Sequence, residues 1–133
     1  MPDLTFEDCL TAREQAAKAY VRGDGAKVDA LVPHDGAASF HSPGGDTVVG
    51  AENVATRYLK DARAFHANGT SRFEVIQKDD GGDLGFWTGF QIAAVQIGEM
   101  PHVVDMRIRV TELFKKIDGR WLLIHRHADI PSN

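Results

Sequence analysis

The sequence predicts an α+β domain in which a curved antiparallel sheet packs against N-terminal helices around one apolar pocket. Two observations predict the elements. Apolar residues recur at three- and four-residue spacing in the first half, and alternating segments separated by Gly- and Asp-rich turns fill the second half. A third observation is their order, since helices followed by sequential hairpins are typical of helices covering one face of an antiparallel sheet.

Composition limits the classes of function. A chain of 133 residues fits one domain, so we expect a single domain over 1–133. The net charge is −4, and no basic run is longer than the pair Lys115–Lys116. Such a chain offers no positive stripe to a phosphate backbone, which argues against a nucleic-acid partner.

The chain also lacks the signals of membrane insertion and export. No apolar run approaches the ~18–20 residues that a membrane span needs. The N-terminal segment 1–7 is acidic and has no apolar signal stretch. Cys9 is the one cysteine, so no internal disulfide can form, and we expect a cytoplasmic location.

The first helix has clear start and stop signals. Thr5 is the expected N-cap, and Glu7 and Asp8 follow in the first turn, where carboxylates suit the helix dipole. The Gly-Asp-Gly sequence at 23–25 ends this helix.

Shorter periodic segments define the remaining elements. A second helix is expected over about 26–32, and a third over about 51–65, where apolar residues recur on one face. The expected strands are 37–42, 72–78, 84–97, 103–116 and 121–129.

The turn of the last hairpin decides which side chains face the helices. A three-residue loop over 117–119 would pair Lys116 with Arg120 and place the even-numbered residues of both strands on one apolar inner face. A two-residue turn would instead set Glu112 opposite His125 and mix the faces. We favour the first register because a one-residue slip would scatter the apolar residues over both faces.

The inner face and the helices should line the pocket, with even-numbered residues of strand 84–97 also facing inward. The expected substrate-contacting residues are Tyr20, Phe40, His41, Ser42, Tyr58, Phe86, Thr88, Phe90, Met106, Ile108 and Phe114. For Tyr20, Tyr58 and Thr88 the alternative is core packing with the polar tip satisfied locally. His41 enters the pocket only if its strand is offset by one residue.

The odd-numbered residues form an outer face that is too polar for a monomer core and too aromatic for plain solvent surface. It comprises Trp87, Arg107, Arg109, Thr111, Trp121, Leu123, His125 and His127. An aromatic and arginine-rich surface of this kind suits a homodimer interface.

Residues 109–129 (RVTELFKKIDGRWLLIHRHAD) resemble the closing hairpin of SnoaL-like and ketosteroid-isomerase-like proteins, which belong to the nuclear transport factor 2-like superfamily. The segment SFHSPGG at 39–45 and the order of elements also fit, so the resemblance covers essentially the whole chain. It implies a cone-shaped fold, a pocket between sheet and helices, and dimers formed through the outer sheet face. The superfamily includes isomerases, cyclases, dehydratases, epoxide hydrolases and non-enzymatic assembly domains.

The catalytic residues of the isomerases do not carry over well. Their aspartate base corresponds to Ser42, and their helix-one tyrosine, an oxyanion donor, corresponds to Ala16. Tyr20 lies one turn later as a substitute, and Glu112 corresponds loosely to the partner acid. We therefore do not predict ketosteroid isomerisation.

Glu112 and Arg126 are the candidate catalytic residues. In the favoured register they lie diagonally across neighbouring strands, at ~7–8 Å, within reach of long side chains. Burial would raise the pKa of Glu112 and Arg126 would lower it. The pair could supply an acid/base and an anion-holding guanidinium, or it could be a structural ion pair.

No metal or cofactor is expected. His125 and His127 share a face, but a zinc site would also need Asp105 or Asp129 to converge on them, and no dinucleotide or phosphate-loop fingerprint is present. The sequence thus predicts a small-molecule-binding protein, of isomerase, cyclase or dehydratase type, acting on a small carbonyl or ring compound. The alternative is a non-catalytic ligand-binding or dimeric assembly domain.

Overall fold

The structure, a computed structural model, describes residues 4–131. The predicted domain 1–133 therefore extends beyond the described residues at both ends. The expectation that the N-terminal segment 1–7 has no apolar signal stretch also falls partly outside them. In chain order the elements are α1 (Phe6–Tyr20), α2 (Ala26–Leu31), β1 (Ser39–His41), β2 (Thr47–Val49), α3 (Ala51–Ala62), β3 (Thr70–Gly81), β4 (Leu84–Val95), β5 (Val104–Ile117) and β6 (Arg120–Asp129). Within residues 4–131, no helix combines the length and apolarity needed to cross a membrane.

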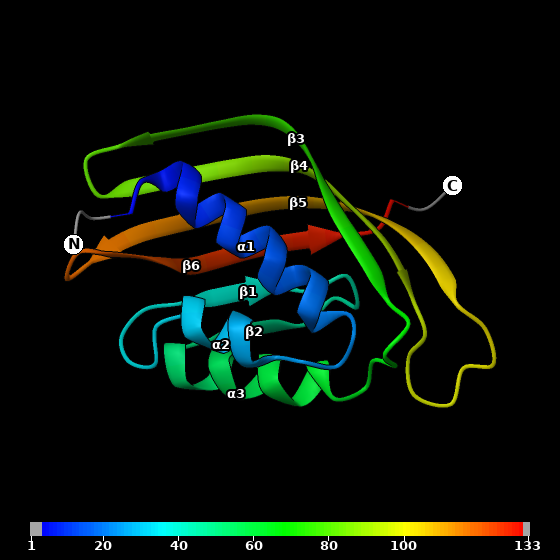
Figure 1. Ribbon diagram of the computed structural model, residues 1–133. Coiled ribbons are helices and arrows are strands. Elements are labelled where there is room, and N and C mark those ends of the chain that lie inside the picture. Colours follow the sequence, from blue (N-terminus) through cyan, green and yellow to red (C-terminus); the bar gives the residue numbers. More distant parts are fainter. Residues whose placement is uncertain (1–3, 132–133) are drawn as a thin grey trace.

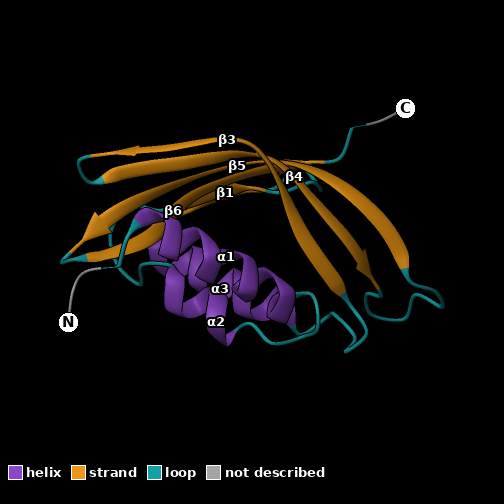
Figure 2. Cartoon of the chain, turned by 45° about the horizontal axis from the view of Figure 1, so that its top comes forward, coloured by secondary structure: helices purple, strands orange, loops and turns teal. Residues whose placement is uncertain are grey.

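The strands form one sheet in the order β2-β1-β6-β5-β4-β3. Its strands curve, and all three helices lie on the concave side (Figure 2). α1 crosses this side while β3, β4 and β5 continue beyond it (Figure 1). The predicted α+β fold is confirmed, with two differences: β2 was not predicted as a strand, and β1 pairs with β6 in parallel.

The start of α1 follows its sequence signal. Thr5 Oγ1 accepts a hydrogen bond from Asp8 N at 3.1 Å, and Thr5 N donates to Asp8 Oδ2 at 3.0 Å. This reciprocal capping box satisfies two backbone donors at the helix start and confirms Thr5 as the N-cap. The helix therefore starts at a fixed point and presents Arg13 on its buried side.

The turn of the last hairpin differs from the prediction. Ile117 pairs with Arg120 across a two-residue turn, whose residues Asp118 and Gly119 have φ values of 51° and 79°. Positive φ at both positions is the type I′ geometry that suits the twist of two hairpin strands. The predicted three-residue loop is therefore wrong.

A bulge at Ile124 in β6 then shifts the register by one residue. Phe114 pairs with Leu123, whereas Leu113, the residue before it in β5, pairs with His125. Before the bulge the odd-numbered Trp121 and Leu123 face inward and are 8% and 2% exposed. Their predicted place on the outer face is wrong, because the two-residue turn shifts this part of β6 by one residue. The bulge then reverses the facing of the residues that follow it.

The inner face of β4 is also opposite to the prediction. Trp87 is fully buried and pairs with Glu112, whereas the predicted inner residues Phe86, Thr88 and Phe90 face outward. Gly85 on this inner side lets α1 pack closely, because a Cβ atom there would lie 2.6 Å from the ring of Phe6. Alternation alone could not assign the faces, since both sides of this strand are partly apolar.

Candidate ligand-binding site

A cavity of about 380 Å³ lies between the helices and the inner face of the sheet. Most of its wall is apolar and comes from every layer: Ala17 on α1, Val28 on α2, Phe40 on β1, Ala93 and Val95 on β4, and Met106 and Ile108 on β5. The size and the apolar lining are typical of a small-molecule site.

Only some of the predicted site residues line the cavity. The cavity wall includes Tyr20, Phe40, His41, Ser42, Tyr58, Met106, Ile108 and Arg126. Phe86, Thr88 and Phe90 lie on the outer face, and Phe114 packs edge-on to Phe6 in the core. Glu112 lies behind the wall, where it contacts the cavity residues Arg13 and Arg126.

Glu112 is fully buried, and both its oxygens are saturated with hydrogen bonds. Oε1 accepts from Trp87 Nε1 at 2.8 Å and from Arg13 Nε at 3.0 Å. Oε2 accepts from Arg13 Nη2 at 2.9 Å and from Arg126 Nη1 at 2.7 Å. Glu112 thus joins α1, β4 and β6 through one carboxylate.

These contacts fix the charge of Glu112. Burial raises its pKa, but the charges of Arg13 and Arg126 outweigh burial and lower the pKa to about 2. A carboxylate with this pKa and no unused oxygen is a weak base. The geometry therefore favours a positioning role, in which Glu112 orients two arginines, over proton transfer.

Arg126 brings the guanidinium of this cluster to the cavity. Its side chain is 13% exposed and lines the wall. Besides its bond to Glu112, its Nη2 donates to Gln91 Oε1 at 2.6 Å, and Gln91 Nε2 donates to Ser71 Oγ at 2.9 Å. Two acceptors thus hold the guanidinium plane in one orientation.

Two tyrosines add hydroxyl groups to the wall. Tyr58 stacks on Phe40 with ring centroids 5.0 Å apart, and Tyr20 packs edge-on to Tyr58 at 6.2 Å. Within residues 4–131, neither hydroxyl has a hydrogen-bond partner, and neither is fully enclosed. Burial raises the pKa of Tyr58 to about 12 and also raises that of Tyr20, so both hydroxyls stay protonated donors.

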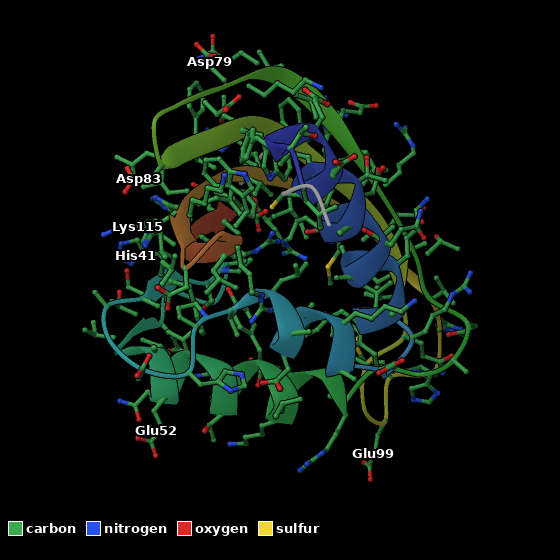
Figure 3. The ribbon with its side chains drawn as sticks, turned by 60° about the vertical axis from the view of Figure 1, so that its left-hand side comes forward. His41, Glu52, Asp79, Asp83, Glu99 and Lys115 are labelled. Carbon is green, nitrogen blue, oxygen red and sulfur yellow. The ribbon has the colours of Figure 1, made fainter. Side chains whose placement is uncertain are left out.

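His41 contributes to the rim, but its ring belongs to a cluster on the outer face. It lies edge-on to His125 and His127 at centroid distances of 5.2 and 5.0 Å. Figure 3 shows His41 on the same side of the molecule as Lys115, away from α1. Burial, followed by the nearby charges of His41 and His127, lowers the pKa of His125. Across residues 4–131, no group of three His, Cys, Asp or Glu side chains is arranged to hold a metal.

Sequence reasoning missed Arg13 and Gln91. Arg13 is 4% exposed and Gln91 is 5% exposed. A signal for Arg13 was present, since it shares the apolar side of its helix with Cys9 and Ala16 at helical spacing. An arginine on such a stripe, in a chain that also buries a strand glutamate, indicates an ion pair between the two.

The comparisons with known proteins agree on one fold. The SnoaL-like domain family matches residues 10–132. No curated protein sequence matches the chain significantly.

Three solved structures illustrate how widely this fold is used. A nuclear transport factor 2-like superfamily protein from Salmonella enterica is 14% identical, with 93% of this chain and 87% of that one covered and a TM-score of 0.76. A ketosteroid isomerase-like protein from Erwinia carotovora is 20% identical, with 86% and 87% covered and a TM-score of 0.66. The CaMKII hub of S. rosetta is 15% identical, with 98% and 100% covered and a TM-score of 0.70. Likenesses at this identity establish the fold alone.

Proposed function

Given that the chain belongs to the SnoaL-like domain family, we propose that it binds a small, mostly apolar molecule in its cavity and holds one oxygen function of that molecule against Arg126, Tyr20 and Tyr58. One observation carries this proposal. Two tyrosine hydroxyls without protein partners, within residues 4–131, and an oriented arginine line a mostly apolar cavity. A few polar groups in an apolar wall are typical of ligand sites.

These donors suit a carbonyl or enolate oxygen. Fixed hydrogen-bond donors in a water-poor site stabilise negative charge as it develops on oxygen. This is the electrophilic half of an isomerase, cyclase or dehydratase reaction on a small carbonyl or ring compound. Asp61 on α3 brings a carboxylate to the cavity wall, where it is paired with Arg57 at 2.9 Å, and we assign it the base.

The second candidate function is ligand binding without turnover. It is favoured by the environment of Glu112, the acid/base candidate of the sequence, whose oxygens are all engaged and whose pKa is about 2. A protein with this cavity and no competent base would retain its ligand unchanged.

Ligand binding followed by turnover assays separates the two. We expect small aromatic and alicyclic ketones to bind saturably to the wild type in calorimetry, and Tyr58→Phe to weaken binding by roughly tenfold, about the effect of one lost hydrogen bond. Thr88→Val, which alters a hydroxyl on the outer face, is the matched control and should bind normally. If the wild type consumes the ketone and Asp61→Asn does not, the result supports the enzymatic function. Absence of saturable binding to any ketone contradicts the proposal.

We also propose that the chain forms a homodimer through its outer sheet face. Of the residues predicted for this interface, Arg107, Arg109, Thr111, His125 and His127 face outward, whereas Trp87, Trp121 and Leu123 are buried inside. Apolar surface is added by Phe90, whose ring lies 3.9 Å from the Arg107 guanidinium, and by Leu113, which is 42% exposed. Such a mixture of apolar and arginine surface is typical of interfaces.

A further inference from the structure

The buried cluster beside the cavity carries an unbalanced charge. Arg13 and Arg126 supply two positive charges, and Glu112 supplies one negative charge, which leaves one positive charge in excess. Both arginines are largely removed from water, with side chains 5% and 13% exposed. An excess charge in such a place is costly unless an opposite charge joins it.

The hydrogen bonding of Arg13 has a matching gap. Its Nε and Nη2 donate to Glu112, but its Nη1 is buried and has no partner within residues 4–131. Buried donors are almost always satisfied, so this one needs an explanation, and a bound water or anion is one. Arg13 is also part of the cavity wall.

The other charged groups nearby are already engaged. Asp61, also in the wall, is bound to Arg57 at 2.9 Å and its side chain is 40% exposed. Glu14, next to Arg13 on α1, accepts a hydrogen bond from Phe73 N at 2.7 Å. Within the described residues, no carboxylate other than Glu112 forms an ion pair with Arg13 or Arg126.

Building on the proposed function, we infer that the ligand is a monocarboxylate whose anionic group binds at Arg126 and Arg13, with its apolar part against Ala93, Val95 and Ile97. A guanidinium binds a carboxylate through parallel hydrogen bonds and gains from its charge. One negative charge balances the cluster, whereas a dianion such as a phosphate monoester would overcompensate it. A neutral ligand would leave the charge buried and unpaired.

Matched pairs of small probes test this inference in the wild-type protein. Benzoate and benzamide, and cyclohexanecarboxylate and cyclohexanecarboxamide, differ in charge but hardly in shape. We expect each acid to bind at least tenfold more tightly than its amide in calorimetry at pH 7. We also expect benzoate to bind more tightly than phenyl phosphate.

A charge-neutral cluster should lose this preference. Arg126→Gln leaves the Arg13–Glu112 pair, whose charges cancel, so the ratio of acid to amide affinity should fall to within about threefold of one. Arg107→Gln removes an exposed arginine of the outer face and should keep the wild-type ratio. The wild-type comparison stands by itself if Arg126→Gln does not fold.

The outcomes separate the inference from the proposed function. Amides that bind saturably and as tightly as the acids overturn the inference and leave the proposed function in place. Phenyl phosphate that binds more tightly than benzoate overturns the single-charge argument. If neither acids, amides nor ketones bind saturably, the proposed function falls, and the inference with it.

Discussion

Replacing Glu112 with glutamine removes the negative charge that Arg13 and Arg126 share. Two buried guanidinium groups would then face each other across a neutral amide, and breaking a buried ion pair in this way costs roughly 3–5 kcal/mol of unfolding free energy. Urea denaturation should register this loss. The matched control is Asp129→Asn, which breaks the exposed pair with Arg109 and should change stability little. Equal effects of the two substitutions would argue against the cluster as a structural centre.

The same carboxylate predicts how stability depends on pH. The pKa of Glu112 is lowered from 4.5 to about 2 in the folded chain, because the two arginines outweigh the effect of burial. The folded state then binds fewer protons than the unfolded state between these pH values. Its contribution is therefore complete above pH 4.5 and is lost as the pH falls towards 2. Unfolding free energies across this window should fall more steeply for the wild type than for Glu112→Gln, and parallel curves would contradict the assignment.

At the scale of elements, the β5–β6 turn depends on a glycine. Gly119 has a φ of 79°, a conformation that costs a residue with a Cβ atom about 1–2 kcal/mol. Gly119→Ala should therefore lower the unfolding free energy by about that amount in urea denaturation. Gly81, at the end of β3, has no atom within 4 Å of an added Cβ, so Gly81→Ala is the control and should be nearly neutral. A neutral Gly119→Ala would rule out the two-residue turn.

The helices and long strands were predictable, whereas the side of the sheet on which each strand residue lies was not. The capping signal at Thr5 predicted the start of α1, and alternation in the second half predicted the long strands. The bulge at Ile124 has no sequence signal, because it inserts one apolar residue into an apolar run. Its effect on the site was nevertheless small, since the shorter turn and the bulge each shift the pairing by one residue in the same direction, and a total shift of two residues restores the predicted facing. Arg126 therefore faces inward as predicted, but it lies directly opposite Glu112 and not diagonally across from it.

At the scale of the whole molecule, the family was easier to predict than the site. The predicted resemblance to SnoaL-like proteins is confirmed, because it rests on the order of elements and on the closing hairpin. The site instead depends on contacts between residues far apart in the chain, such as Arg13 with Glu112 and Arg126 with Gln91. The packing of α1 against the sheet brings the first pair together, and the strand order β6-β5-β4 brings the second pair together. Neither helical nor strand periodicity reports these arrangements.

The proposed dimer gives a prediction for the molecule as a whole. Leu113 is 42% exposed and, with Phe86 and Ile124, lines an apolar groove on the outer face. A carboxylate there would be removed from water if this face meets a second copy, which is costly. Leu113→Glu should therefore convert a dimer of the wild type into monomers in size-exclusion chromatography with light scattering. Leu4→Glu, at a residue 65% exposed that precedes α1, should remain dimeric. A monomeric wild type, or a Leu113→Glu variant that still dimerises, would show that the outer face serves another purpose.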